Sequence, residues 1–150
     1  MTDAAADHAL SRYAAELGEK AEQATFRARG KAWEKLYDEK THFFLPKDPQ
    51  GRSIPVNATY MGGEYTEGTP WHYNFMVPHD APALAEKMTR PVFLGRLEQF
   101  FLRSICTGKV SYLPNAYYWP SNEPQLFSAW AFATVDDSVR AGRFLRYVTT

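Results

Sequence analysis

The sequence has a single cysteine, Cys106, so it can form neither an intrachain disulfide nor a cysteine-based zinc site. Its 17 basic and 17 acidic residues give a formal net charge of zero. No basic tract favours nucleic acid or an anionic membrane as a partner. No apolar run is long enough to span a membrane, and the first ten residues lack the pattern of a signal peptide. We therefore expect no nucleic-acid or membrane partner and, for the chain as written, a cytoplasmic location.

Several common catalytic signatures are also missing. The chain contains no HExxH motif, no glycine-rich phosphate loop and no GxSxG motif. It does contain 45% hydrophobic and 15% aromatic residues in 150 positions, which is enough for the core of one domain or of a piece of a larger one. Cys106 lies in an apolar, helix-like pattern, and this predicts a small buried side chain.

Hydrophobic spacing predicts a mainly α chain made of consecutive helical hairpins. The expected helices cover residues 3–17, 20–37, 81–88, 91–108 and 139–148, with another beginning at Pro124. Gly30 weakens the second of these helices. The residues expected to face inward are Leu10, Tyr13, Ala14 and Leu17 in the first helix, and Leu126, Trp130 and Ala133 in the helix after Pro124. A turn is expected at 48–51, where the sequence reads DPQG.

The chain is organised around residues 63–80, which read GEYTEGTPWHYNFMVPHD. Thr69 is a typical N-cap and Pro70 a typical first helical residue, and a later Val-Pro pair ends this helix after about two turns. Glu67 immediately precedes the helix, and Asp80 precedes the next one. The simplest interpretation of both carboxylates is helix capping.

A second aromatic loop, residues 109–124, also leads into a helix start and carries Glu123. If the helices alternate in direction, the two loops emerge at the same end and their carboxylates line one mouth. Aromatic rings can pack on the apolar faces of sugars, and glycoside hydrolysis uses a protonated carboxylic acid with a second carboxylate opposite. The alternative is that these aromatic residues are core. His72 and His79, seven residues apart, could ligate a metal or simply form hydrogen bonds.

Two motifs resemble glycoside hydrolase family 92, a family of calcium-dependent, inverting exo-α-mannosidases. The first reads YTEG at 65–68, followed by Trp71, Tyr73 and VPHD at 77–80. The second reads YWPSNEP at 118–124. The segment EKLYDEKTHFFLPKDPQG and the helical region 84–101 are also similar to the family, so the resemblance extends over about residues 26–148.

The resemblance implies a role for each candidate residue. Glu67 would be the general acid that protonates the glycosidic oxygen, and Glu123 would bind hydroxyl groups of the terminal mannose. Asn122 would lie near the calcium ion, since hard cations favour oxygen ligands. The expected substrate-binding set is completed by Trp71, His72 and Trp119, where His72 replaces a glutamine of the family pattern. The structural residues would be His79 and Asp80.

The implied fold is an (α/α)6 toroid, of which residues 1–150 would be a partial catalytic domain. The β-sandwich domain of the full enzymes and the later segment with the general-base aspartate have no counterpart here; Asp136 and Asp137 are interpreted as a helix cap. The expected substrate is a mannose-containing glycan with a terminal α-1,2 linkage. Activity would need a second chain, or further copies, to complete the toroid. The alternative is a non-catalytic helical module that binds carbohydrate or another protein. Family members are often secreted or periplasmic.

Overall fold

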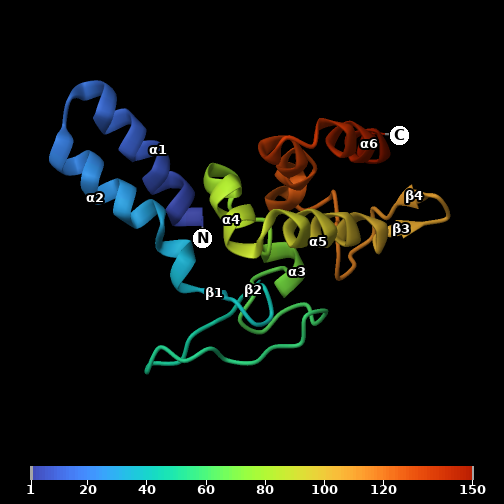
Figure 1. Ribbon diagram of the computed structural model, residues 1–150. Helices are drawn as coiled ribbons and strands as arrows, with labels where there is room; N and C mark the ends of the chain where they lie inside the picture. Colours follow the sequence, from blue (N-terminus) through green and yellow to red (C-terminus); the bar gives the residue numbers. More distant parts are fainter. Residues whose placement is uncertain (1, 150) are drawn as a thin grey trace.

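The computed structural model describes residues 2–149 as a mainly helical chain, as predicted (Figure 1). The longer helices are α1 (Thr2–Leu17), α2 (Lys20–Gly30), α4 (Ala81–Met88), α5 (Arg90–Leu102) and α6 (Ser138–Thr149). The shorter and 3₁₀ helices are η1 (Ala32–Lys35), α3 (Pro70–Tyr73), η2 (Pro78–Asp80) and η3 (Glu123–Val135). Two antiparallel pairs of short strands are formed by β1 (Tyr37–Asp38) with β2 (Phe43–Phe44), and by β3 (Ile105–Cys106) with β4 (Lys109–Val110). Among the described residues, no helix is long and apolar enough to cross a membrane.

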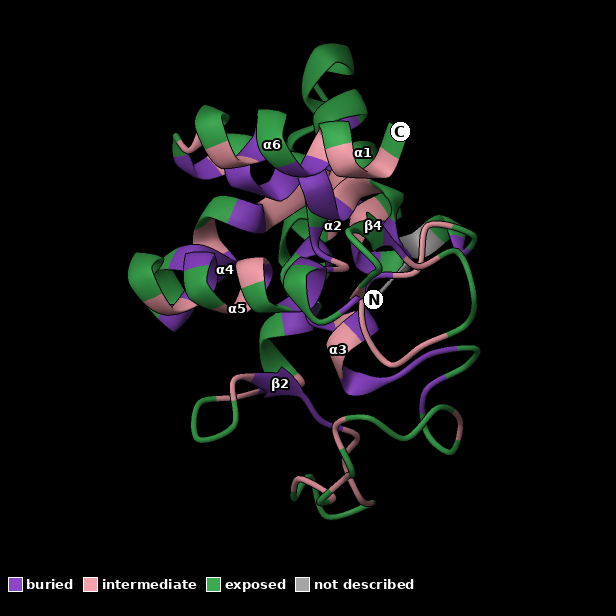
Figure 2. Ribbon diagram, turned by 90° about the vertical axis from the view of Figure 1, so that its right-hand side faces the viewer, coloured by how far each residue is buried: buried purple, intermediate pink, exposed green. Residues whose placement is uncertain are grey.

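The core lies where α5 meets α6 and η3, and it is built from stacked phenylalanines. Phe101 stacks on Phe144 with ring centroids 4.7 Å apart, and Phe144 stacks on Phe132 at 5.2 Å. All three rings are completely buried. Such offset aromatic pairs add roughly 0.5–1.5 kcal/mol each beyond the area that they bury. This cluster holds α6 against α5 and η3, and Figure 2 shows α6 exposed along its outer side and buried along the side that faces the rest of the chain.

The α1–α2 hairpin extends to one side of this body, but α1 presents a different face to α2 than predicted (Figure 1). Ala14 is buried as expected, whereas three large residues predicted to face inward are exposed: Leu10, Tyr13 and Leu17. The two helices approach closely at Gly30, where an added Cβ would lie 3.3 Å from the backbone of His8. The face of α1 with small residues therefore packs on α2, and the larger side chains point away.

The predicted helix over 20–37 is shorter than expected, because α2 ends at Gly30. A 3₁₀ turn then carries Trp33 into the core, where its indole N–H donates to Asp80 Oδ2 at 3.1 Å. Asp80 immediately precedes α4, whose bounds match the prediction, but its side chain makes no capping bond. The predicted capping role of this carboxylate is therefore wrong, and its described partner is Trp33.

The predicted helix ending near Gly108 stops at Leu102, and the β3–β4 hairpin follows it. The two residues that connect these strands, Thr107 and Gly108, both have positive φ, 53° and 80°. This is the backbone that a tight two-residue hairpin requires. Cys106 lies in β3 and is exposed. The prediction that it is buried in a helix was therefore wrong.

The segment after Pro124 is a 3₁₀ helix rather than the expected α-helix, so a different set of its side chains faces the core. With three residues per turn, side chains three positions apart share a face. Ala129, Phe132 and Val135 accordingly point into the core. The residues predicted to face inward on α-helical spacing are instead exposed: Leu126, Trp130 and Ala133.

Candidate active site

The central stretch forms α3, and Thr69 and Pro70 begin this helix as predicted, although it is only one turn long. A reciprocal capping box closes its start. The hydroxyl of Thr69 accepts the backbone N–H of His72 at 3.3 Å, and the backbone N–H of Thr69 donates to Nδ1 of His72 at 3.2 Å. Two backbone donors that a helix start leaves unpaired are thereby satisfied.

His72 also connects this helix to the second aromatic loop. Because Nδ1 accepts a hydrogen bond, Nε2 carries the proton and donates to the carbonyl of Tyr117 at 2.6 Å. The hydroxyl of Thr69 donates to the carbonyl of Ala116 at 2.9 Å. Burial lowers the pKa of His72, which favours the neutral ring. Since both ring nitrogens are engaged, direct contact between His72 and a substrate would require breaking one of these bonds.

Glu67 lies just before α3 with an exposed side chain and a left-handed backbone, φ 51°. Such a conformation is unfavourable for a residue other than glycine, and it occurs often at functional sites. The next residue, Gly68, allows close packing, because an added Cβ would lie only 2.9 Å from the ring of Tyr73. The amide nitrogen of Asn122 donates to the carbonyl of Glu67 at 3.0 Å. The structure thus brings the two predicted loops together through Asn122 and Glu67.

On the second loop, Asn122 is largely buried at the start of η3, and Glu123 is exposed. The indole N–H of Trp119 donates to the carbonyl of Tyr112 at 3.1 Å. The backbone N–H of Trp119 donates to Oε1 of Gln125 at 2.8 Å. Gln125 is completely buried, so its side chain fixes the turn that carries Trp119, Asn122 and Glu123. Sequence reasoning gave Gln125 no role, and a polar residue within an apolar run was its only signal.

The indole of Trp71 is half-buried between two other rings. Its centroid lies 5.3 Å from that of Phe43 in an edge-to-face arrangement and 5.5 Å from that of Tyr117. The guanidinium carbon of Arg96 lies 4.7 Å from the Trp71 centroid. These contacts join α3 to β2, the second loop and α5. The contribution of Arg96 was missed, because no local pattern links a residue of α5 to Trp71.

Residues 2–149 hold no group of three His, Cys, Asp or Glu side chains that could bind a metal ion. The second histidine of the predicted pair, His79, shares a 3.0 Å hydrogen bond through Nε2 with the carbonyl of Gly30. A ring nitrogen in contact with a carbonyl carries the proton, so His79 uses Nε2 as a donor. Its contact therefore joins η2 to the α1–α2 hairpin and is structural.

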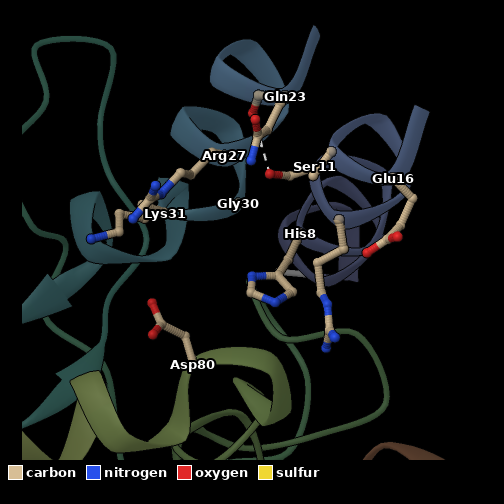
Figure 3. Close-up of a pocket in the computed structure, with 10 residues that line it drawn as sticks. His8, Ser11, Glu16, Gln23, Arg27, Gly30, Lys31 and Asp80 are labelled. Atoms are coloured by element: carbon tan, nitrogen blue, oxygen red, sulfur yellow. Dashed lines mark hydrogen bonds between the residues drawn. The ribbon is translucent and has the colours of Figure 1, made fainter. Parts of the chain in front are cut away.

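A hollow of about 530 Å³ lies elsewhere, between α1, α2 and η2 (Figure 3). Charged side chains from all three elements line it, including Arg27, Lys31 and Asp80. The basic residues at the end of α2 complement the negative end of its helix dipole, which accounts for their position. None of the predicted site residues lines this hollow.

Comparison with known proteins gives one family. The sequence profile of the Glycosyl hydrolase family 92 catalytic domain matches residues 1–150. The chain superimposes on the family GH92 alpha-mannosidase BT3965 from Bacteroides thetaiotaomicron in complex with mannoimidazole, with a TM-score of 0.85 and 22% identity over 97% of this chain and 21% of that one. A second structure of the family GH92 alpha-mannosidase BT3965 from Bacteroides thetaiotaomicron gives a TM-score of 0.84 and 23% identity over 97% of this chain and 19% of that one. No curated protein matches.

The chain spans about a fifth of the length of these solved relatives, and the similarity at this level of identity establishes the shared fold. The helical pairs predicted from the sequence thus correspond to a part of the family's helical toroid. Together with the match over all 150 residues, this shows that the chain belongs to glycosyl hydrolase family 92.

Proposed function

We propose that this chain is a portion of an α-mannosidase catalytic domain that hydrolyses terminal α-mannosides, with α-1,2 as the expected linkage and with inversion at the reacting carbon. The observation that supports this most strongly is the Asn122–Glu67 hydrogen bond of 3.0 Å. It joins the two loops that each carry a candidate carboxylate, Glu67 and Glu123. A family relative has been solved with mannoimidazole, which supports a mannose-type ligand.

In this proposal, Glu67 is the general acid. Its carboxyl group donates a proton to the glycosidic oxygen as the bond to the leaving sugar breaks. The role requires a defined backbone, and the bond from Asn122 to the Glu67 carbonyl holds this backbone at its positive φ. The fixed backbone limits the space that the carboxylate can sample, which favours a reactive geometry.

Glu123 would bind hydroxyl groups of the terminal sugar, since an ionised carboxylate is a strong hydrogen-bond acceptor. The indoles of Trp71 and Trp119 would contact the apolar faces of the ring. His72 would contribute by joining the two loops. Because both of its ring nitrogens bond to the backbone, its proposed part in substrate binding is indirect.

Calcium is the expected cofactor, and the described residues offer only part of a ligand set. Calcium requires six to eight oxygen ligands. The side-chain oxygen of Asn122 has no hydrogen-bond partner among residues 2–149, so it is the candidate ligand in this chain. Because no set of three acidic or histidine ligands converges in the same part of the chain, the calcium site is incomplete here and we assign it no step of the reaction.

Exposed apolar side chains support completion of this unit by further helices, from a second chain or from additional sequence. Two groups of these side chains lie on helices, one on α1 with Leu10, Tyr13 and Leu17, and one on η3 with Leu126 and Trp130. The general base would also have to come from outside the described residues. Asp137 is not suited to this role, because it caps α6 through the N–H of Arg140 at 3.0 Å and pairs with the same arginine.

Calorimetric titration of the purified chain with mannoimidazole tests the proposal. We expect binding that is weakened at least tenfold in Glu123→Ala and unchanged in Glu64→Ala, a matched control at another exposed glutamate. Absence of binding by the folded chain would refute the proposed subsite.

In any preparation that releases mannose from α-1,2-mannobiose, Glu67→Gln should abolish release and Glu64→Gln should not. Binding without hydrolysis in every assembly would favour the non-catalytic carbohydrate-binding module.

A further inference from the structure

Arg96 carries a half-buried positive charge that lies against two aromatic rings. Its guanidinium carbon is 4.3 Å from the centroid of Phe43 and 4.7 Å from that of Trp71. These rings meet edge to face, so one guanidinium contacts both at once. A cation within about 6 Å of an aromatic centroid is attracted by the ring quadrupole, and the attraction grows as water is excluded.

No carboxylate pairs with Arg96 among residues 2–149, whereas four other arginines pair with one: Arg29, Arg52, Arg140 and Arg143. Arg29, for example, pairs with Asp7 at 3.1 Å. The amide of Asn74 is a polar partner of Arg96. When this amide is oriented so that its nitrogen donates to the carbonyl of His42 at 2.6 Å, its oxygen accepts from Nε of Arg96 at 3.3 Å. The rings and this neutral amide therefore stabilise the charge.

Burial lowers the pKa of Arg96 to about 10. The charged form is disfavoured when a cation loses water without gaining an anion. No ion pair within residues 2–149 therefore accounts for the presence of a guanidinium at this position. A planar guanidinium can stack on a ring and hold it in one orientation, which lysine and apolar side chains do less well.

The geometry of Trp71 indicates this role for the guanidinium. The indole belongs to α3, which has four residues and cannot hold itself in place. Tyr117 contacts the indole at 5.5 Å, and Arg103 stacks on Tyr117 at 5.4 Å while donating to its hydroxyl at 2.9 Å. Arg96 lies on α5, and Arg103 is the C-cap residue of the same helix, seven residues later, so the two side chains lie on one side of it. Helix α5 thereby fixes a row of rings.

We propose that Arg96 is a positioning residue that fixes the indole of Trp71 for contact with the bound sugar. This proposal rests on the proposed function, because the sugar contact of Trp71 belongs to it. It assigns to α5, which carries none of the predicted site residues, a direct influence on the shape of the subsite.

Fluorine NMR of the chain labelled with 5-fluorotryptophan tests the positioning directly. The chain has four tryptophans, and the variant Trp71→Phe identifies the signal of Trp71. In Arg96→Met we expect the Trp71 signal to shift or broaden more than the other three, and in Arg96→Lys to lie between methionine and wild type. Arg12→Met, at an exposed arginine of α1, is the matched control and should leave all four signals unchanged. An unmoved Trp71 signal in Arg96→Met would overturn the proposal, and Arg96→Lys decides if the methionine variant does not fold.

A further readout separates positioning from simple packing. Arg96→Met should also weaken mannoimidazole binding by about tenfold. A displaced indole with unchanged affinity would overturn the link to sugar binding. If wild type binds no mannoimidazole, the proposed function fails, while the fluorine signals still decide whether Arg96 positions Trp71.

Discussion

His72 connects the two loops of the site through hydrogen bonds of its ring, and substitutions of this residue can remove them. The side chain is 1% exposed, so loss of its ring nitrogens leaves the N–H of Thr69 and the carbonyl of Tyr117 without their partners. A buried polar group left unpaired costs about 1–3 kcal/mol. His72→Phe should therefore destabilise the chain by roughly 2–6 kcal/mol, a large part of the 5–15 kcal/mol typical of a folded domain.

The variant His72→Asn separates the two bonds. The side-chain oxygen of asparagine lies near the position of Nδ1 and can accept from Thr69, but the amide is too short to reach Tyr117. We expect its cost to be about half that of His72→Phe. Urea unfolding followed by circular dichroism measures both free energies, provided that the slope with denaturant is unchanged. A change below about 0.5 kcal/mol in His72→Phe would refute the reasoning.

Lowering the pH is a second way to perturb His72. Burial lowers the pKa of His72 in the folded state below its usual value of about 6.5. Between the two pKa values the unfolded chain binds more protons, so stability falls as the pH is lowered below about 6.5. Protonation would also remove the acceptor for Thr69. In His72→Asn this part of the acid sensitivity should be absent.

Three further predictions concern the surroundings of the site. Asn122→Asp removes the donor to the Glu67 carbonyl and should destabilise the chain by about 1–3 kcal/mol in urea unfolding; equal stability would contradict the role of this bond. Gly68→Ala places a Cβ 2.9 Å from a tyrosine ring and should cost about 1–3 kcal/mol in the same assay. Burial raises the pKa of Tyr65 and of Tyr118 to about 12. The free energy of unfolding should therefore fall between pH 10 and 12, by about 2–3 kcal/mol for each tyrosine. In Tyr118→Phe, the part of this decrease that is due to Tyr118 should be absent.

The parts of the fold that are determined by residues close together in the sequence could be predicted. Thr69 caps α3 and Pro70 begins it, because both preferences arise from the local backbone. The turn at 48–51 forms with a 2.8 Å bond from the N–H of Gly51 to the carbonyl of Asp48. The last helix begins at Ser138 after the cap at Asp137, close to the expected boundary.

The direction of side chains could not be predicted in two helices, because it depends on the partner and on the helix type. Small residues of α1 pack against Gly30, which leaves Leu10 and Tyr13 outside. In η3, the 3₁₀ repeat of three residues moves Trp130 to the surface and Phe132 to the core. No single-residue propensity predicts a 3₁₀ helix of this length.

The two loops of the candidate site could be identified from the sequence, but the bonds between them could not. The motifs identified the two loops, and the structure brings these loops together. The bonds that join them go from side chains to carbonyls far along the chain, from His72 to Tyr117 and from Asn122 to Glu67, 45 and 55 residues apart. A carbonyl acceptor has no sequence signature, because every residue carries one.

We expect the loops around Glu67 and Glu123 to form one sugar-binding site. The most direct measurement is a titration of the isotope-labelled chain with mannoimidazole, followed by the backbone amide signals in NMR spectra. We expect shifts in both loops, at residues 66–74 and at residues 117–125, with similar dependence on concentration. Shifts confined to one loop, or located instead around the hollow between α1 and α2, would contradict this expectation.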